Sequence, residues 1–331
     1  MTAAALSPDG RKLFTSAGSG GAAEVVFVSD WMAQVWDVAT GKELGRFSTQ
    51  IGGIGQGMAQ FSPDGKQLLM VAGEQLVLLD IVSGRQVFAV PAKCLRDFRW
   101  DCTVSFSPDG RRIVELADYG AALLRSATNG EPVVSIACPD GVFVSGRFSP
   151  DGKQLLTVSF TGTARTWEVK SGRLVQVFAA PRGIVNDGLF VGDGRKVLTA
   201  PQERDDSRGT AGLAGSGDMT ARLWDAASGR EIRQFRLPPG TYFPRMILSR
   251  DGKRLILEWG SHDQRYATLW DLDTGQEITR LNLSGGKVYM LGFSQTDERF
   301  MVVNYEGKDT GKPAALWDGA TGKLIREFPG P

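Results

Sequence analysis

Apolar residues lie in short runs along the whole chain, and polar segments that contain glycine separate them. Residues 58–61 (MAQF) and 67–73 (QLLMVAG) form one pair of such runs, and residues 146–148 (GRF) and 154–158 (QLLTV) form another. Runs this short, bounded by turn residues, predict β-strands rather than helices. The pattern therefore predicts an all-β protein.

One turn motif, Ser-Pro-Asp-Gly followed by a basic residue, accounts for many of the polar segments. It begins at Ser7, Ser62, Ser107 and Ser149, and altered copies occupy residues 192–196, 249–253 and 294–298. Proline presets φ at the second position of a tight turn, aspartate bonds to nearby backbone, and glycine accepts a positive φ. We predict that each copy joins two antiparallel strands as a hairpin.

A second motif follows each of these turns and again occurs seven times. It comprises the segments VWDVATGK, LLDIVSGR, LLRSATNGE, TWEVKSGR, LWDAASGR, LWDLDTGQ and LWDGATGK. Three and six residues after the turn glycine the chain is always apolar: Leu44 and Phe47, Val87 and Val90, Val133 and Ile136, Val175 and Phe178, Ile232 and Phe235, Ile278 and Leu281, Ile325 and Phe328. This pair predicts a buried edge of one strand. Because each run is short and begins at a turn, we attribute the spacing of three to a β-bulge or strong twist rather than a helix.

Together the two motifs define a unit of four strands that repeats through the chain. We place the tryptophan-type position of the second motif at residues 36, 79, 124, 167, 224, 270 and 317, which lie 43 to 57 residues apart. Four-strand units at this period predict a seven-bladed β-propeller, with four antiparallel strands per blade, as a single domain over residues 1–331. The predicted blades are 1–50, 51–92, 93–138, 139–180, 181–238, 239–284 and 285–331.

The repeated segments resemble the WD40 family of β-propellers, in its bacterial form. The Trp-Asp pair of that family stands at Trp36-Asp37, Trp224-Asp225, Trp270-Asp271 and Trp317-Asp318, and it is relaxed to Leu79-Asp80 and Trp167-Glu168. The resemblance covers the whole chain and implies a rigid scaffold for protein binding. The family's Gly-His dipeptide is missing, and the one histidine, His262, lies elsewhere. We therefore expect no buried hydrogen-bond network that uses histidine.

Composition narrows the classes of partner. The 38 basic and 37 acidic residues give a net charge of +1, which argues against nucleic acid. No apolar run reaches the roughly 20 residues of a membrane-spanning helix, and the start of the chain shows no secretory leader, so we expect a cytoplasmic protein without membrane contact. Cys94, Cys102 and Cys138 lack metal-site spacing and are predicted to be reduced thiols.

Variation between the repeats indicates where a partner binds. Connections between the second and third strands (b to c), and from the fourth strand to the next blade (d to a), lie at the end opposite the turn motifs. Insertions at 18–31 and 201–217 fall there, and the d-to-a segment 94–102 combines arginine with aromatic residues, as binding hot spots do. The predicted contact residues are Arg96, Phe98, Arg99, Trp100, Phe143, Arg182, Ile184, Tyr242, Phe243, Lys287 and Tyr289.

Three functions stay open at this point. The first is a non-enzymatic scaffold that binds a protein or peptide segment, acidic or phosphorylated in one version, without catalytic residue, metal or cofactor. The second is a hydrolase or lyase with a site at the mouth of the central funnel, where Asp101, Asp187 and Asp263 are candidates. The third is a structural propeller domain of a larger polypeptide, for example a kinase-linked one, whose upstream domain is missing from this chain.

Overall fold

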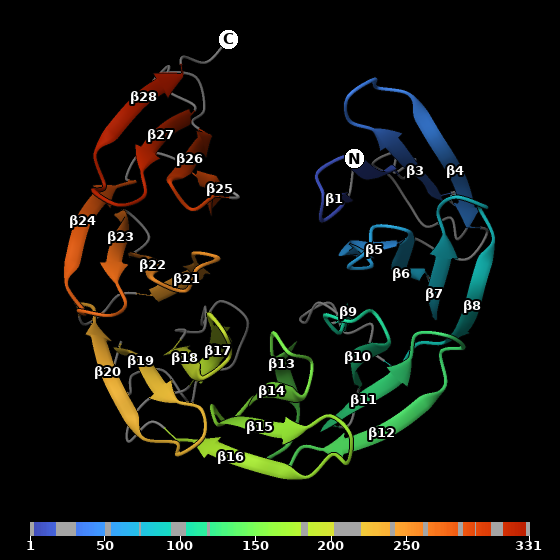
Figure 1. Ribbon diagram of the computed structural model, residues 1–331, viewed down its shortest axis with the longest axis horizontal. Helices are drawn as coiled ribbons and strands as arrows, with labels where there is room; N and C mark the ends of the chain where they lie inside the picture. Colours follow the sequence, from blue (N-terminus) through green and yellow to red (C-terminus); the bar gives the residue numbers. More distant parts are fainter. Residues whose placement is uncertain are drawn as a thin grey trace, which may run out of the picture. The chain divides into compact units, whose positions relative to one another are not determined.

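Seven four-stranded sheets make up the part of the chain that the structure describes (Figure 1). This computed structural model describes residues 3–17, 31–49, 54–72, 74–93, 104–117, 120–179, 185–201, 220–238, 242–260, 264–283, 287–294, 296–305 and 314–328. Within each sheet the four strands follow chain order, and these residues contain no α-helix. The fold is the seven-bladed β-propeller that the sequence predicts. We call the strands of each blade a to d and number the blades in chain order.

The strands have the following bounds. Blade 1 contains β1 (Ala3–Leu6), β2 (Lys12–Ala17), β3 (Trp31–Asp37) and β4 (Glu43–Thr49), and blade 2 contains β5 (Ile54–Phe61), β6 (Gln67–Ala72), β7 (Gln75–Asp80) and β8 (Gln86–Pro91). Blade 3 contains β9 (Val104–Phe106), β10 (Arg112–Ala117), β11 (Ala121–Ser126) and β12 (Pro132–Ala137), and blade 4 contains β13 (Phe143–Phe148), β14 (Gln154–Ser159), β15 (Ala164–Glu168) and β16 (Leu174–Phe178). Blade 5 contains β17 (Val185–Val191), β18 (Lys196–Pro201), β19 (Thr220–Asp225) and β20 (Glu231–Arg236). Blade 6 contains β21 (Tyr242–Leu248), β22 (Arg254–Gly260), β23 (Arg265–Asp271) and β24 (Glu277–Asn282), and blade 7 contains β25 (Lys287–Phe293), β26 (Arg299–Tyr305), β27 (Ala314–Asp318) and β28 (Leu324–Phe328).

The chain divides into two compact units. The first consists of Met1–Phe160 with Thr166–Val175 and includes blades 1 to 3. The second consists of Thr161–Arg165 with Gln176–Pro331 and includes blades 5 to 7, while the strands of blade 4 belong partly to each.

The Ser-Pro-Asp-Gly turns have the local structure that their residues predict. In blade 2 the Ser62 hydroxyl donates to Asp64 Oδ1 (2.6 Å) and accepts the N–H of Gln67 (2.9 Å). Asp64 Oδ1 also accepts the N–H of Lys66 (3.0 Å), and Gly65 has a φ of 67°. The bonds from Ser62 and then Lys66 lower the pKa of the Asp64 carboxyl. The predicted roles of aspartate and glycine in this turn are thus confirmed, and the serine hydroxyl adds two hydrogen bonds that the sequence analysis does not predict.

Neighbouring turns also pack on one another in the first unit. A Cβ added to Gly110 would lie 3.5 Å from Cδ of Pro63, the turn proline of the preceding blade, and one added to Gly152 would lie 3.5 Å from Cδ of Pro108. The proline therefore packs against the next turn as well as shaping its own. This second contact explains why the whole motif is repeated, since each turn must fit its neighbour.

The altered turns of blades 6 and 7 contact each other through hydrogen bonds instead of through a proline ring. Arg250 replaces the proline of blade 6 and brings back a backbone N–H. That N–H and the N–H of Asp251 donate to the two carboxylate oxygens of Asp297, at 2.9 and 2.8 Å. Asp297 occupies the turn-glycine position of blade 7 with a φ of 59°, which is unfavourable for a residue with a side chain. Its bonds to blade 6 offset that cost.

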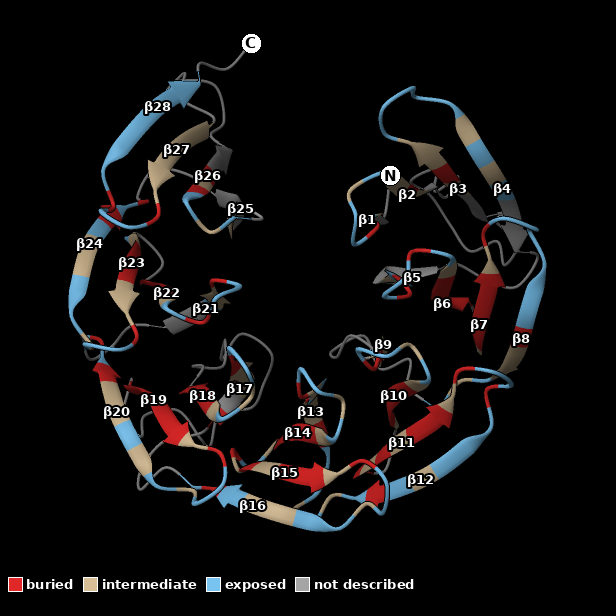
Figure 2. Cartoon of the chain, in the orientation of Figure 1, coloured by how far each residue is buried: buried red, intermediate tan, exposed pale blue. Residues whose placement is uncertain are grey.

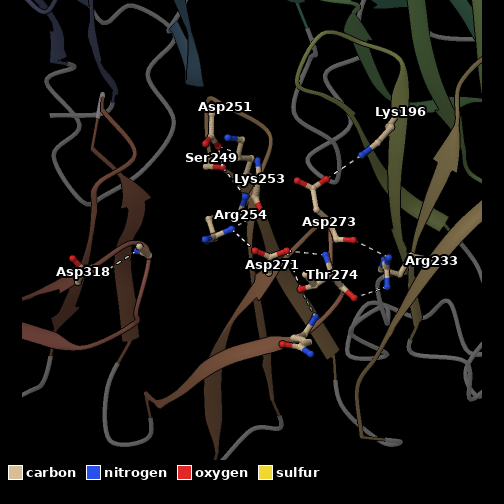
Figure 3. Close-up of polar contacts among 12 residues, drawn as sticks. Lys196, Arg233, Ser249, Asp251, Lys253, Arg254, Asp271, Asp273, Thr274 and Asp318 are labelled. Atoms are coloured by element: carbon tan, nitrogen blue, oxygen red, sulfur yellow. Dashed lines mark hydrogen bonds and ion pairs between the residues drawn. The ribbon is translucent and has the colours of Figure 1, made fainter.

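Polar contacts between c-to-d turns and the preceding blade reinforce the second unit (Figure 3). Arg233 of blade 5 donates to the backbone oxygens of Asp273 (2.8 Å) and Thr274 (2.6 Å) in the turn of blade 6. Lys196 of blade 5 forms an ion pair with Asp273 at 3.3 Å. Within the same turn, Asp271 accepts hydrogen bonds from the N–H and hydroxyl of Thr274. The turns therefore join blades 5 and 6 at one edge of their interface.

The core of the protein lies between successive blades. Buried residues concentrate on strands b and c, while strand d is largely exposed (Figure 2). In the second unit Phe178 and Phe235 of strand d are fully buried, and their rings contact Trp224 and Trp270 of the following blade at 6.0 and 5.5 Å. Burial of these large side chains stabilises each pair of blades.

The predicted β-bulge in strand d is confirmed. In blade 5, Leu223 pairs with Arg233 and Trp224 pairs with Glu231, so Ile232 has no residue opposite. The same register shift occurs between strands c and d of blades 1, 2, 3, 6 and 7.

The bulge corrects one expectation about burial. The second apolar residue of the pair is buried in blades 3 to 6, at Ile136, Phe178, Phe235 and Leu281, as predicted. The first residue is instead exposed in five blades, at Leu44, Val87, Val133, Ile232 and Ile325. In these five blades the bulged residue is exposed, so the pair does not form one buried edge, whereas Ile278 of blade 6 is partly buried against the core.

A tryptophan-to-threonine hydrogen bond recurs across the repeats. The indole Nε1 of Trp36, Trp167 and Trp224 donates to the hydroxyl of Thr15, Thr157 and Thr199 on strand b, at 2.8 to 2.9 Å. In blades 6 and 7 the strand-b position holds Leu257 and Val302, and the buried Nε1 of Trp270 and Trp317 has no partner among the described residues. These bonds form without histidine.

Blade 3 corrects the predicted alignment of the second motif. Arg112 pairs with Ser126 in this blade, as Lys12 pairs with Asp37 in blade 1. The tryptophan-type position of blade 3 is therefore Arg125 rather than Leu124, and the strand-b threonine position is Glu115. Leu124 matches the other blades in apolar character, but the turn glycine, five residues after each tryptophan, places the motif one residue later.

We predict that Thr199→Val lowers the free energy of unfolding by about 1–3 kcal/mol, because the buried indole N–H of Trp224 loses its acceptor while the side-chain volume is kept. Urea unfolding of the full chain measures this loss. The control is Thr199→Ser, which keeps an acceptor and should lose less. Equal losses in the two variants would contradict a role for the hydrogen bond.

Candidate functional site

The two ends of each sheet differ in how constant their connections are. Connections from a to b and from c to d contain five residues in every blade, apart from the four between Val191 and Lys196. Connections from b to c range from two residues, between Ala72 and Gln75, to eighteen, between Pro201 and Thr220. We call the first end of each sheet the turn end and the second, which carries the b-to-c and d-to-a connections, the variable end. Loops of varied length on a constant scaffold are a frequent place for binding residues.

Six of the predicted contact residues lie outside the described residues. They are Arg96, Phe98, Arg99, Trp100, Arg182 and Ile184. Their proposed role stays a prediction.

Four further contact residues are brought to the variable ends of two neighbouring strands. Tyr242 and Phe243 begin β21, and Lys287 and Tyr289 lie in the first half of β25. β21 and β25 are the first strands of blades 6 and 7, and they contact each other. Two segments 45 residues apart in the chain, from Tyr242 to Lys287, therefore meet in one region.

Phe143 is placed differently from the other contact residues. Its side chain is only 9% exposed and belongs to the core cluster between blades 3 and 4. Its ring meets the edge of Trp167 with 6.3 Å between centroids. Packing accounts for this residue, and we do not assign it a contact with a partner below.

Three charged residues that the sequence pattern did not predict lie together near the variable end of blade 6. Glu258 of β22 is opposite Arg245 of β21, and Arg265 lies on β23. The Glu258 carboxylate is 3.9 Å from Nε of Arg245 and 3.7 Å from Nη1 of Arg265. The equivalent positions on strand b of the other blades hold Ser16, Val71, Leu116, Val158, Ala200 and Val303. The signal available in the sequence was a charged residue at a strand-b position that holds a small or apolar residue in the other blades.

Burial makes Glu258 electrostatically unusual. Its side chain is 2% exposed, and its Oε2 atom has no hydrogen-bond partner among the described residues. Burial raises the pKa of the Glu258 carboxyl above its ordinary value, although Arg245 and Arg265 act in the opposite direction. Carboxyl groups with a shifted pKa occur at functional sites and also in structural ion pairs.

The two arginines are accessible, unlike the glutamate between them. The Arg245 side chain is 45% exposed and that of Arg265 is 31% exposed. Two guanidinium groups beside one carboxylate leave an excess of positive charge near the variable end of blade 6. This arrangement can attract a carboxylate or phosphate group of a partner, which guanidinium groups bind through paired N–H donors.

The structure describes only some of the candidate catalytic residues and cysteines. His262, Asp101 and Asp263 lie outside the described residues, as do Cys94 and Cys102. Asp187 of β17 accepts the N–H of Gly188 at 2.8 Å, and Cys138 is a partly exposed cysteine. Within the described ranges, no three His, Cys, Asp or Glu residues are grouped so that they could hold a metal ion. No helix in those ranges has the length and apolar character needed to cross a membrane.

No protein-family model and no curated protein matches the chain. Among solved structures, the C-terminal WD40 domain of Sif2 is similar over 91% of this chain and 77% of its own, with a TM-score of 0.66 and 16% sequence identity. Dihydro-heme d1 dehydrogenase NirN, in complex with DHE, is similar over 99% of this chain and 65% of its own, with a TM-score of 0.71 and 18% identity. At these identities the likeness concerns the fold, which this chain shares with a WD40 domain.

We predict that Glu258→Gln raises the free energy of unfolding at pH 7 and that this gain disappears as the pH falls toward 4. A carboxyl with a raised folded-state pKa binds its proton more tightly in the folded protein, so the folded state loses stability as the pH rises above the ordinary value of about 4.3. Denaturant unfolding of both proteins between pH 4 and pH 8 tests this dependence.

Whether Glu258→Gln raises or lowers the free energy of unfolding at pH 7 distinguishes a dominant cost of burial from dominant ion pairing. If ion pairing with the two arginines dominated, Glu258→Gln would lower stability at pH 7. Arg195→Gln, which removes one member of an exposed ion pair with Asp193 at the turn end, serves as a control. It should show little change at any pH.

Proposed function

We propose that this chain is a non-enzymatic interaction module that binds an acidic protein or peptide segment at the variable ends of its blades. The contrast between the two ends of each sheet carries the proposal. The turn end keeps one structure from blade to blade because its turns pack on each other. The connections at the variable end differ in length from blade to blade, as the loops of a recognition surface do.

The described charges near the variable end of blade 6 favour an acidic partner. Arg245 and Arg265 expose guanidinium groups, while the glutamate between them is buried. Tyr242, Phe243, Lys287 and Tyr289 enter the same region on the backbones of β21 and β25. Aromatic residues with arginine are the usual anchors of protein interfaces. We extend the surface to Arg96, Phe98, Arg99, Trp100, Arg182 and Ile184 as part of the proposal.

The fold supports a binding role without specifying the partner. A WD40 domain shares it, and a rigid scaffold lowers the ordering cost of binding. We further propose that the protein acts in the cytoplasm, either alone or as the propeller part of a larger polypeptide.

An enzymatic role is the second candidate. It is supported by the likeness to NirN, which is a dehydrogenase, and by the raised pKa of Glu258. The burial of Glu258 argues against direct contact between its carboxylate and a substrate. A hydrolase or lyase site at the funnel mouth would instead have to use the aspartates named above.

We predict that a glutamate-rich peptide binds the full chain and that its glutamine-substituted twin does not. Fluorescence anisotropy of labelled peptides measures both affinities, at low salt and at about 150 mM salt. The double variant Arg245→Gln, Arg265→Gln should weaken binding of the acidic peptide by about tenfold or more, equivalent to about 1.4 kcal/mol.

Two further variants make this experiment specific. Lys153→Gln with Arg195→Gln removes two exposed positive charges from the turn end and should leave the affinity unchanged. Removing both arginines leaves the Glu258 carboxylate buried without a positive charge from either of them. Adding Glu258→Gln to the double variant removes that buried charge and tests whether a loss of peptide binding reflects misfolding. Equal binding of the two peptides, or an equal loss in the turn-end control, would contradict the proposed surface.

A further inference from the structure

Blade 3 replaces the tryptophan-to-threonine hydrogen bond of blades 1, 4 and 5 with a buried ion pair. Arg125 takes the tryptophan position and Glu115 the threonine position, as the strand register requires. Nε of Arg125 lies 2.6 Å from Oε2 of Glu115. The side chains are 4% and 0% exposed. The exchange thus places two opposite charges where the other blades have a neutral pair.

One remaining hydrogen bond of this pair stays in blade 3, from Nη1 of Arg125 to the backbone oxygen of Gly130 (2.9 Å), and two others lead to the end of blade 2. Nη2 of Arg125 donates to the backbone oxygen of Pro91 (3.4 Å), the last residue of β8. Oε1 of Glu115 accepts the backbone N–H of Lys93. Between them, the N–H of Ala92 donates to the backbone oxygen of Glu74 at 2.8 Å. Three successive residues are therefore held, two of them by side chains from the next blade.

These three residues begin the longest d-to-a connection of the chain. Twelve residues separate Pro91 from Val104, whereas the other d-to-a connections contain four to six. The exchange of Trp and Thr for Arg and Glu thus occurs in the blade that follows this connection. In blades 4 and 5, where the connections are shorter, the neutral pair is kept.

Stability alone does not explain the charged pair. Removing two charges from water is costly, and a buried ion pair is often no more stabilising than a well-packed neutral replacement. What the ion pair adds is a set of directed bonds. Arg125 has five N–H donors in a fixed plane, and Glu115 has two acceptor oxygens, so the pair can bond to blade 2 while the partners satisfy each other.

We propose that Glu115 and Arg125 are positioning residues that hold the entry of the connection between β8 and β9 in place. This rests on the proposed function, because the connection carries Arg96, Phe98, Arg99 and Trp100 of the proposed surface. The buried pair sets the position of residues 91–93, where the chain leaves blade 2, and does not itself contact the partner.

The double variant Glu115→Thr, Arg125→Trp tests the positioning role, because it installs the pair that blades 1, 4 and 5 already use. We expect the full chain to keep its fold, with a thermal midpoint within a few degrees of the wild type. Trypsin cleavage after Lys93, Arg96 and Arg99, followed by mass spectrometry without any partner, should accelerate at least tenfold. Hydrogen exchange in a peptide covering residues 91–93 should increase in parallel.

A second variant keeps the test decisive if the first does not fold. Glu115→Gln retains an acceptor for the N–H of Lys93 but removes the charge beside Arg125, so its cleavage should be faster than wild type by a smaller factor. The control Arg195→Gln, in an exposed ion pair at the turn end, should be cleaved at the wild-type rate. Wild-type cleavage and exchange in a folded double variant, or in Glu115→Gln, would overturn the proposal.

The same proteins separate this inference from the proposed function. If cleavage accelerates and the acidic peptide still binds with wild-type affinity, the positioning role stands and the surface assigned to this connection is wrong. If cleavage is unchanged but the peptide binds through the arginines of blade 6, the interaction module stands and the positioning role fails.

Discussion

The structure depends on one contact, in which strand d of a blade packs against the tryptophan-type position of the next. A single four-stranded sheet has two faces and cannot bury both by itself, so each repeat requires a neighbour. In the second unit Phe178 meets Trp224 and Phe235 meets Trp270. The bulge in strand d makes this possible, because it directs one apolar residue into the interface and the preceding one outward. The turn end then adds contacts between neighbouring turns within each unit.

This dependence on neighbours divides the chain into constrained and unconstrained parts. Residues that face another blade, or a neighbouring turn, must fit a repeated partner and therefore repeat themselves. Connections at the variable end follow no repeated motif, and their lengths differ widely. Two buried glutamates show a similar contrast between satisfied and unsatisfied contacts. Glu115 and Arg125 satisfy each other and the backbone of blade 2, whereas Glu258 keeps an oxygen without a described partner and has a raised pKa.

The fold was predictable from the sequence because its signals are local. Serine, aspartate and glycine act within five residues, so the Ser-Pro-Asp-Gly turns and the hairpins they close follow directly from the residues present. Alignment by hydrophobicity failed at Leu124, where the true equivalent of tryptophan is Arg125. Burial of the first apolar residue in strand d also failed, because a bulge changes which side chains face the core.

The candidate site was less predictable because it depends on contacts between strands. Arg245, Glu258 and Arg265 are distant in the sequence, and only the register of β21, β22 and β23 brings them together. Glu258 does break the pattern of small or apolar residues at its position, but this departure is visible only once the blades are aligned strand by strand. The pairing of residues across strands therefore brings these three side chains together, which the linear sequence does not show.

The most direct test of the account compares the two ends in one experiment. A photo-crosslinking amino acid is placed at exposed Gln264, at the variable end of blade 6, and separately at exposed Val82 and Ala320, at turn ends. Each protein is irradiated with the labelled glutamate-rich peptide. The account predicts crosslinks from Gln264 and none above background from Val82 or Ala320. Equal or stronger crosslinking from the turn ends would contradict the assignment of function to the variable end.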